Sequence, residues 1–572
     1  MNAKTMLVAI VFLVALATVT ACAAPATPTP LPVVATKVAP PTQPPPTVAP
    51  TTAPTAVPPT AAAKPTVAPT VAPTKPKTGG SLTYVLNQDI ATLDPGMMRF
   101  AVEQMIGQQI YDSLYWLDKD QNLQPGLAKS FKVNADSTVF DFELRNDVKF
   151  HDGTPFNADA AVAWFNRLLD PNFKIGGAVV YLGRISKVEK TGDYSIRFTL
   201  KAPSLSFLKD MAQRYSGIGS AKAAAAAGDK FGVQPVGTGA FIFKEYLPGS
   251  HVKLARNPDY KWGPAFLKHD GPAYLDEVVF KFIPEDASRT AAIESVNAHV
   301  ISRTPYADAT RLTKNTKFTV VSNYISGVPQ YNALNVSIEP TNDLKVRQAI
   351  IYATDTAGVV KTVYFGLTKP AYGPVNQWQP NFEPKVKDMY SYNPEKAKQL
   401  LTEAGWKPGA DGIREKDGKK LMVIIGQNQG WNEWVEFLQA NLKAVGFDAK
   451  ISTLTSAANT ERCNSCKEAM PCNGGVNYDP LALNGFFGTK ASSNWSCLKD
   501  AKLDALIDEA VTTLDWAKRD QLIKQIQLHI MENAYMLPIV ELAFYTTMQA
   551  NVEGIVYDAT GFFPLLLDAR IN

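Results

Sequence analysis

The residue pair with the most reactive chemistry in this chain is His151 and Asp152. An imidazole beside a carboxylate can act as a general base with its orienting acid, as in hydrolases. The pair stands in the stretch His151-Asp152-Gly153-Thr154-Pro155, however, and Asp-Gly is typical of a turn. Adjacent side chains in a tight turn point apart in most cases. The pattern therefore favours a structural role, with a secreted hydrolase as the alternative.

Four of the five cysteines gather in one region, at Cys463, Cys466, Cys472 and Cys497. In an exported chain such a cluster indicates disulfides, and four cysteines allow three pairings. If Cys472 and Cys497 form one pair, closing that loop contributes about 3 kcal/mol. Four thiolates could instead hold zinc or an iron–sulfur cluster, although the spacing fits no standard metal pattern. We expect disulfides that pin a loop beside a ligand pocket.

Other candidate chemistry is weaker, and we expect neither a cofactor nor a metal. The glycine-rich loop at residues 235–241 could cradle phosphate, but no GK[ST] follows it and a strand pattern comes next. Nickel or haem would need clustered ligands, whereas the histidines are scattered without helical ligand spacing. They are His151, His251, His269, His299 and His529.

The N-terminus indicates export and anchoring. Lys4 precedes an apolar run at residues 6–19 that is too short for a typical membrane span, and Val19-Thr20-Ala21-Cys22 follows. This pattern resembles a bacterial lipoprotein signal, which implies that residues 1–22 are the signal and that Cys22 carries the lipid. An ordinary secretory peptide is the alternative. No later stretch is long and apolar enough to span a bilayer, so we expect a body tethered to the membrane on its extracytoplasmic side.

Residues 23–78 consist almost entirely of Pro, Thr, Ala and Val, which predicts a disordered stalk. A fully extended chain of this length reaches on the order of 170 Å. The whole sequence has 57 basic and 53 acidic residues. Because five of the basic residues precede Thr78 and no acidic residue does, the remainder carries 52 against 53 and is nearly neutral. Nucleic acid is therefore not expected as a partner.

Local patterns predict several elements. Alternation predicts hairpins over residues 130–145 and 187–200. Helical spacing predicts helices over residues 102–114, 431–445 and 515–534, and three further helices begin at Asn157, Asp343 and Asn393, whose side chains can cap them.

Ordered motifs recur along most of the chain. Pro125, Leu127, Ala128 and Ser130 precede L-R-x-x-V-x-F-H-D-G-T-P-F, which ends at Phe156. T-L-D-P stands at residues 92–95, P-V-G-T-G at 235–239, and V-R-Q-A-I-x-Y-A-x-D begins at Val346. These strings resemble those of the extracytoplasmic solute-binding proteins of the peptide/nickel class, family 5, that feed ABC importers.

The resemblance implies an α/β chain with the type II periplasmic-binding-protein fold, in which two lobes flank a hinged cleft and one lobe carries an inserted domain. The expected first lobe comprises residues 79–118, 233–333 and 537–572. The inserted domain comprises residues 119–232, and the second lobe residues 334–536.

The same resemblance points to the residues that bind the ligand. In peptide-binding relatives an Asp shortly before a D-P pair holds the ligand's α-amino group. Aligned on Asp479-Pro480, that position is Val476, which cannot neutralise an ammonium ion. Unless Asp479 takes the role, the usual peptide anchor is missing, so a sugar, another uncharged polar solute or a blocked peptide fits better. The expected ligand-binding residues are Met97, Arg99, Phe100, Trp378, Trp431, Trp434, Asn477, Tyr478, Asp479, Asn484, Phe486 and Trp495. For each tryptophan, core packing is the competing explanation.

We therefore expect a monomeric, lipid-anchored solute-binding component of an ABC importer and not an enzyme. It would capture a small organic solute, oligopeptide-like or oligosaccharide-like, and deliver it to a membrane permease. The alternative is a ligand-sensing lipoprotein on the same fold without a transport role.

Overall fold

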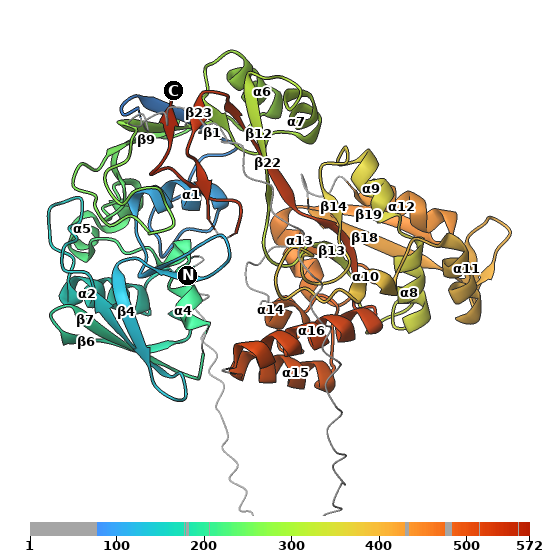
Figure 1. Ribbon diagram of the computed structural model, residues 1–572. Helices are drawn as coiled ribbons and strands as arrows, with labels where there is room; N and C mark the ends of the chain where they lie inside the picture. Colours follow the sequence, from blue (N-terminus) through green and yellow to red (C-terminus); the bar gives the residue numbers. More distant parts are fainter. Residues whose placement is uncertain are drawn as a thin grey trace, which may run out of the picture. The chain divides into compact units, whose positions relative to one another are not determined.

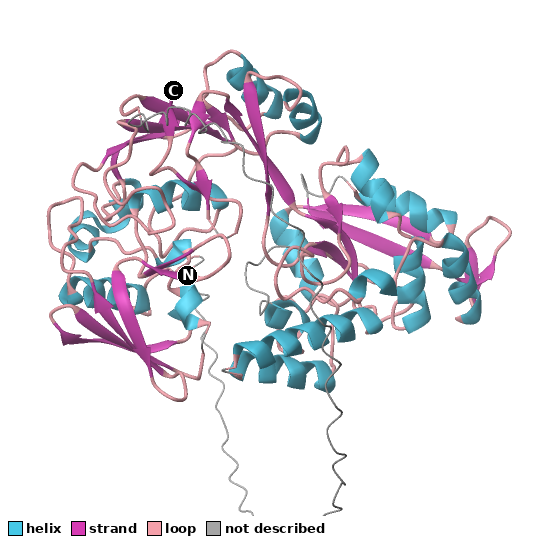
Figure 2. Cartoon of the chain, in the orientation of Figure 1, coloured by secondary structure: helices cyan, strands magenta, loops and turns pink. Residues whose placement is uncertain are grey.

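The computed structural model describes residues 77–572 except 175, 177, 179–181, 205, 429–433, 475–482, 514 and 559. The described residues belong to one compact unit. The predicted signal, its Cys22 and the stalk up to residue 76 lie outside them. Figures 1 and 2 show the arrangement of the helices and strands.

A seven-stranded mixed sheet organises the first part of the fold. Its order is β12-β22-β11-β1-β10-β9-β8, and β1 runs parallel to both of its neighbours. The strands are β1 (Ser81–Leu86), β8 (Phe241–Leu247), β9 (His251–Arg256), β10 (Glu277–Phe282), β11 (Val300–Ile301), β12 (Phe318–Tyr324) and β22 (Ala543–Gln549).

The two faces of this sheet carry different helices, because side chains alternate along a strand. Tyr84 of β1 shares a buried cluster with Met105 of α1 (Ala101–Ile110), whereas the next residue, Val85, packs with Ile293 of α6 (Asp286–Glu294). On β22, Tyr545 packs with α7 (Tyr306–Leu312). Helix α1 therefore covers one face, and α6 and α7 cover the other.

Helix α1 ends four residues earlier than its apolar spacing predicts, because Asp112 anchors the chain beyond it. Tyr111 is already extended. The buried Asp112 carboxylate accepts hydrogen bonds from Thr238 Oγ1 at 2.8 Å, Trp262 Nε1 at 2.9 Å and Tyr260 Oη at 3.1 Å. Burial raises the pKa of this carboxyl group, and the three donors oppose that rise. The contact joins the loop at residues 235–239 to the end of α1.

An antiparallel sheet of order β4-β5-β7-β6 forms the core of residues 119–232 and confirms both predicted hairpins. Helix α2 (Ala158–Leu169) packs Trp164 and Phe165 into the same core, and Asn157 caps it by accepting from the Ala160 N–H at 2.9 Å. The strands are β4 (Ala128–Val133), β5 (Val139–Leu144), β6 (Ile185–Gly192) and β7 (Ser195–Leu200), with β2 (Tyr115–Leu117), β3 (Leu123–Pro125), α4 (Phe207–Asp210) and α5 (Ala221–Ala227) beside them.

A second core lies around the four-stranded sheet β14-β21-β13-β20 and the parallel pair β18 and β19. The predicted caps Asp343 and Asn393 are confirmed. The helix predicted over residues 431–445 begins at Val435, with Trp434 as its N-cap, and residues 431–433 of the prediction lie outside the described residues. The elements are β13 (Gln330–Ala333), β14 (Lys369–Pro370), β18 (Met422–Asn428), β19 (Asp448–Leu454), β20 (Asn473–Gly474), β21 (Met536–Glu541), α8 (Leu344–Ala353), α9 (Thr356–Thr362), α11 (Pro394–Glu403), α12 (Val435–Ala444), α13 (Ser456–Asn464), α14 (Leu483–Phe487), α15 (Ala501–Thr512) and α16 (Trp516–Glu532).

Two segments of chain connect the seven-stranded and four-stranded sheets. Residues 325–329 lead from β12 to β13, and Leu542 links β21 to β22. We call these two segments the hinge. The predicted domain boundaries stay a prediction, and β13 pairs in the four-stranded sheet although it precedes the predicted boundary at residue 334.

Candidate ligand-binding site

The loop that carries Met97, Arg99 and Phe100 is held by one buried carboxylate, that of Glu103 in the first turn of α1. One oxygen accepts from the N–H groups of residues 91 and 92, at 2.9 and 3.2 Å, and the other from those of Arg99 and Phe100, at 2.7 and 2.9 Å. The Phe100 side chain is 50% exposed and Arg99 is also exposed. A rigid loop therefore presents these side chains at the surface.

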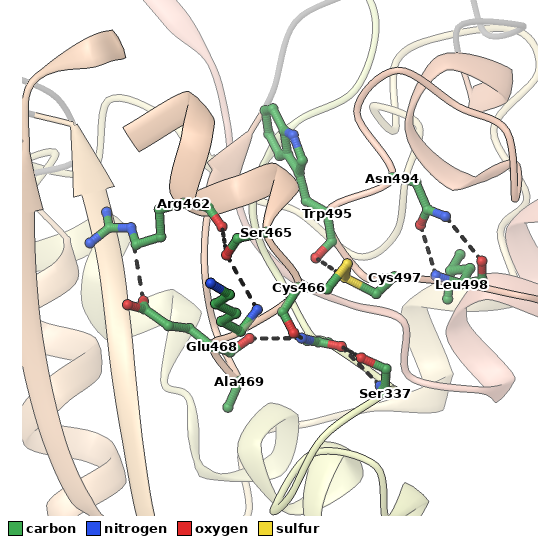
Figure 3. Close-up of a disulfide and its surroundings, with 12 residues drawn as sticks. Ser337, Arg462, Ser465, Cys466, Glu468, Ala469, Asn494, Trp495, Cys497 and Leu498 are labelled. Carbon is green, nitrogen blue, oxygen red and sulfur yellow. Dashed lines mark hydrogen bonds and ion pairs between the residues drawn. A yellow bond between two sulfur atoms is a disulfide. The ribbon is translucent and has the colours of Figure 1, made fainter. Parts of the chain in front are cut away.

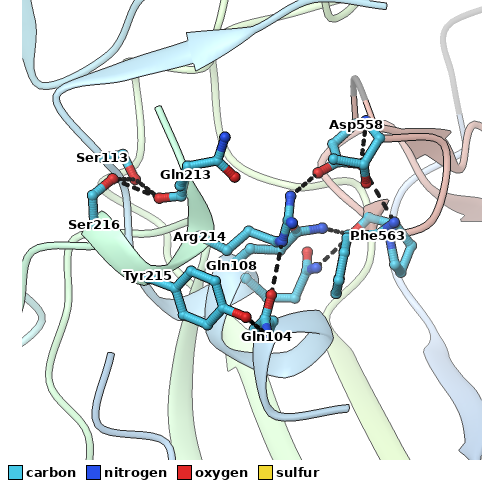
Figure 4. Close-up of polar contacts among 12 residues, drawn as sticks. Gln104, Gln108, Ser113, Gln213, Arg214, Tyr215, Ser216, Asp558 and Phe563 are labelled. Atoms are coloured by element: carbon cyan, nitrogen blue, oxygen red, sulfur yellow. Dashed lines mark hydrogen bonds and ion pairs between the residues drawn. The ribbon is translucent and has the colours of Figure 1, made fainter. Parts of the chain in front are cut away.

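Next to this loop lies a polar cluster around Arg214 (Figure 4). Its guanidinium group forms an ion pair with Asp558, donates from Nε to Gln104 Oε1 at 3.1 Å and stacks over Phe563 at 3.7 Å. Gln104 in turn donates to Tyr215 Oη at 2.7 Å. The ion pair is nearly buried, with 5% and 12% of the two side chains exposed. The charge of this wall is therefore compensated internally, the Gln104 amide is buried within it, and the Tyr215 ring is partly exposed.

Gln104 ties this cluster to the predicted loop, because its side-chain amide donates to the Phe100 carbonyl oxygen at 3.4 Å. Sequence reasoning missed Gln104, Arg214 and Asp558. Their separations along the chain are 110 and 344 residues. No local pattern could have joined them.

A group of aromatic side chains forms the corresponding wall beside the four-stranded sheet. Phe486 lies 6.0 Å from Trp495 and 6.3 Å from Tyr331 between ring centroids. Gly474 fits between these rings: a Cβ atom there would lie 2.6 Å from Trp495 and 2.7 Å from Tyr331. We call Tyr331, Phe486 and Trp495 the aromatic wall. Phe486 and Trp495 are partly exposed and can stack on an apolar or sugar-like surface, whereas the buried Tyr331 supports them from behind.

Two disulfides hold the chain on both sides of this wall. Cys463 bonds to Cys472, directly before β20, and Cys466 bonds to Cys497, two residues after Trp495. Figure 3 shows the second bond with its surroundings, where Cys497 Sγ lies 3.8 Å from the Trp495 carbonyl oxygen. The disulfide prediction is confirmed. A Cys472–Cys497 pair is not formed.

Comparison with known proteins now identifies the family. Residues 122–495, more than half of the chain, match the model of bacterial extracellular solute-binding proteins, family 5 middle. The chain belongs to this family. Oligopeptide-binding protein AppA of Bacillus subtilis is 30% identical over 471 residues, 79% of this chain and 84% of AppA. Heme-binding protein A of Haemophilus influenzae is 28% identical over 482 residues, 80% of this chain and 86% of that protein.

Solved structures of family 5 proteins share the fold. NikA from Brucella suis in complex with Fe(III)-EDTA matches with a TM-score of 0.77 and 26% identity, covering 86% of this chain and all of NikA. AppA of Bacillus subtilis with a nonapeptide matches with a TM-score of 0.70 and 26% identity, covering 87% of this chain and 100% of AppA. The predicted two-lobe type II fold is confirmed, and the chain is a solute-binding protein of a family of binding proteins.

Within this family fold, the remaining predicted ligand residues lie in different environments. Phe486 and Trp495 come together as predicted, and Asn484 is exposed on α14 nearby. Trp434 is fully buried and donates from Nε1 to Gln330 Oε1 at 2.7 Å, so it is a core residue and its assignment to the ligand is wrong. Trp378 is 37% exposed, and its neighbours in sequence, residues 376 and 379, bond to residues 325–327. Trp431, Val476, Asn477, Tyr478 and Asp479 lie outside the described residues.

The His151 side chain has a structural role in the family motif. Its Nδ1 accepts from the Gly237 N–H at 3.4 Å and its Nε2 contacts the Gly239 carbonyl oxygen at 2.9 Å. Asp152 instead accepts from Thr154 and from Ser220 Oγ, the latter at 2.9 Å. Burial lowers the pKa of His151 to about 4. Both ring nitrogens of His151 hold the loop at residues 235–239, and the Asp152 carboxylate bonds to Thr154 and Ser220 instead.

Two further properties of the described residues concern membranes and metals. Within residues 77–572, apart from the gaps given above, no helix is both long and apolar enough to cross a bilayer. The same residues contain no group of three or more His, Cys, Asp or Glu side chains placed to hold a metal ion.

Proposed function

We propose that this chain is the extracytoplasmic solute-binding component of an ABC importer and that it captures a small organic solute between its two lobes. The membership in family 5 carries this proposal. A ligand held between lobes that are joined by a two-segment hinge is enclosed when the lobes close, and the closed form is the state that a permease can recognise.

The chemistry of the two walls favours an uncharged polar solute, oligosaccharide-like or a blocked oligopeptide. The Arg214–Asp558 ion pair leaves the first wall without net charge, and the partly exposed Tyr215 can bond a neutral polar group. The aromatic wall offers ring faces. If Val476 occupies the usual anchor position, a free ammonium group of the ligand would lose its hydration without gaining a carboxylate partner. AppA is named for oligopeptides and Heme-binding protein A for heme, so the solute varies among relatives.

A screen by thermal unfolding of residues 23–572 tests this proposal. A solute that binds the folded state raises the melting temperature by mass action. Neutral oligosaccharides and N-acetylated peptides should raise it, whereas the same peptides with free amino groups should not. The shift should disappear in Trp495→Ala and persist in Tyr392→Ala, which replaces a 52% exposed aromatic ring directly before the N-cap of α11. A shift with free-amine peptides alone would refute the uncharged-solute assignment.

We further propose that Cys22 anchors the mature protein and that residues 23–78 serve as its stalk, with the folded part acting as a monomer. Labelling of cells with radioactive palmitate should mark the native protein and leave Cys22→Ser unlabelled and released from the membrane fraction. A Cys22→Ser protein that stays in the membrane fraction would contradict the lipid anchor.

A further inference from the structure

A cavity of about 490 Å³ lies beside the hinge, away from the walls described above. Its lining includes Asn87 and Arg303 from the edge of the seven-stranded sheet, Tyr306 at the start of α7, and Tyr364 and Phe365 after α9. None of the described residues assigned to the solute lines it. The volume is within the range of about 300–1,000 Å³ that small-molecule sites occupy.

Part of the cavity lining faces away from the Arg214 cluster across the seven-stranded sheet, whereas Phe544 of the same lining contacts Phe562 on the α1 face. Ala543 and Tyr545, which line the cavity, pack against Ala309 of α7. Gln104, which bonds Arg214, belongs to α1 on the other face. The cavity is therefore a separate candidate site and not an extension of the solute cleft.

The lining contains five aromatic rings, which come from both sides of the hinge. Tyr306 and Tyr364 meet edge to face with 4.9 Å between ring centroids. Three further rings complete the set: Phe365, Phe544 and Tyr545. Neutral polar side chains among them, including Asn87, Thr304 and Gln330, can exchange single hydrogen bonds with a ligand.

The lining contains four acidic or basic side chains, those of Asp286, Arg289, Arg303 and Glu541. Arg289 forms an ion pair with Asp286, and Arg303 stacks over Phe544 at 4.2 Å. Burial raises the pKa of the Glu541 carboxyl group, which disfavours its charged form. The guanidinium group of Arg303 therefore adds a cation–π contact to the rings of the lining.

Two residues on opposite walls adopt a backbone conformation that L-residues rarely adopt. Arg303 has a φ of 51° and Phe365 a φ of 54°. Bulky residues in this left-handed region cost of order 1–3 kcal/mol each, and such residues gather at functional sites. The Phe365 ring is also 52% exposed. The strain holds an aromatic ring at the edge of the cavity instead of in the core.

The cavity also spans the hinge. Leu542, which links β21 to β22, lines it together with residues on both sides, and Tyr545 Oη donates to the Leu367 carbonyl oxygen across the two sheets. A rotation of one sheet relative to the other must therefore change the distance between Tyr306 and Tyr364. A molecule that contacts both rings favours whichever hinge angle fits it best.

We propose that this cavity is a second ligand site, which takes a small aromatic molecule of indole size against the contacting rings of Tyr306 and Tyr364 and thereby biases the hinge angle. The proposal is independent of which solute the cleft binds.

Ligand-observed fluorine NMR with 5-fluoroindole tests the site on residues 23–572. We expect saturable binding with a Kd of roughly 0.1 mM, typical of a ligand this small. Ala307→Trp places a large side chain at an exposed position of the lining and should weaken binding at least about tenfold by filling the cavity. Ala225→Trp, at an exposed alanine of the equally short helix α5, should bind like the native protein.

A second pair of variants tests the site without filling the cavity. Phe365→Ala removes a half-exposed ring from the cavity and should weaken binding, whereas Tyr392→Ala removes an equally exposed ring elsewhere and should not. Nitroxide labels at Leu247→Cys and Tyr392→Cys should report a changed distance distribution when 5-fluoroindole is added. Equal binding by Ala307→Trp and native protein, or the absence of saturable binding, would overturn the site. An unchanged label distance in the bound protein would overturn the effect on the hinge.

Discussion

The His151 side chain should make the stability of this protein fall in mildly acidic solution. In the folded state the ring is neutral, because Nδ1 accepts from the Gly237 N–H and Nε2 donates to the Gly239 carbonyl oxygen. Protonating Nδ1 would convert the acceptor into a second donor facing that N–H. Burial adds the cost of a desolvated charge, and together these lower the pKa of His151 to about 4.

The size and sign of the effect follow from proton linkage. An unfolded histidine has a pKa of about 6.5, so below that pH the unfolded chain binds a proton that the folded chain does not. Stability is therefore lost as the pH falls from 6.5 towards 4. The full difference between the folded and unfolded pKa values corresponds to about 3 kcal/mol of unfolding free energy. About 2 kcal/mol of it is lost between pH 7.5 and pH 5.0.

Urea unfolding of residues 23–572 at both pH values, for native protein and His151→Gln, isolates this contribution. The loss of unfolding free energy on going to pH 5.0 should be smaller in His151→Gln by about 2 kcal/mol. His251→Gln, whose ring contacts the neighbouring Ser250 hydroxyl, serves as the matched control. An equal loss in native protein and His151→Gln would refute the reasoning, because it would mean that His151 is not held neutral by the loop.

Two further predictions concern the ion pair and the disulfides. Arg214→Met should destabilise the fold by about 3–5 kcal/mol, because it leaves Asp558 buried without its partner, and combining it with Asp558→Asn should restore most of that loss. Denaturant unfolding of the two single variants and the double variant measures this coupling, and additive losses would contradict it. Replacing Cys466 and Cys497 together by Ser should cost about 3.7 kcal/mol, against about 2.7 kcal/mol for Cys463 and Cys472, because the sequence separations are 31 and 9 residues. The opposite order in the same unfolding assay would show that loop closure does not set their contributions.

Local features of this fold could be predicted from sequence because their causes lie within a few residues. The alternation of Phe140, Phe142 and Leu144 requires a strand with one buried face, and these three side chains are buried in the structure. Asn157 caps a helix three residues away through a single hydrogen bond. The motif strings also pointed to the correct family, since they preserve turns and caps of this kind.

Sequence could not decide which aromatic residues face a ligand. Trp434 and Trp495 are equivalent candidates by residue type, yet the first is buried against Gln330 and the second joins Phe486. The difference depends on which side of the four-stranded sheet each segment packs against, which is a property of the tertiary structure. Sequence reasoning also missed Tyr331, because its contact with Phe486 joins β13 to a segment that is far away in the chain.

The sequence by itself determined the two-lobe family fold, the hairpins and helix caps, the presence of disulfides and the turn around His151, because each depends on local spacing or on an ordered motif. Tertiary structure alone decided the pairing of the four cysteines, the cluster of Gln104, Arg214 and Asp558, and the cavity beside the hinge. These features join residues that are far apart in the chain. Their contacts arise from how the sheets and helices pack, which no local pattern records.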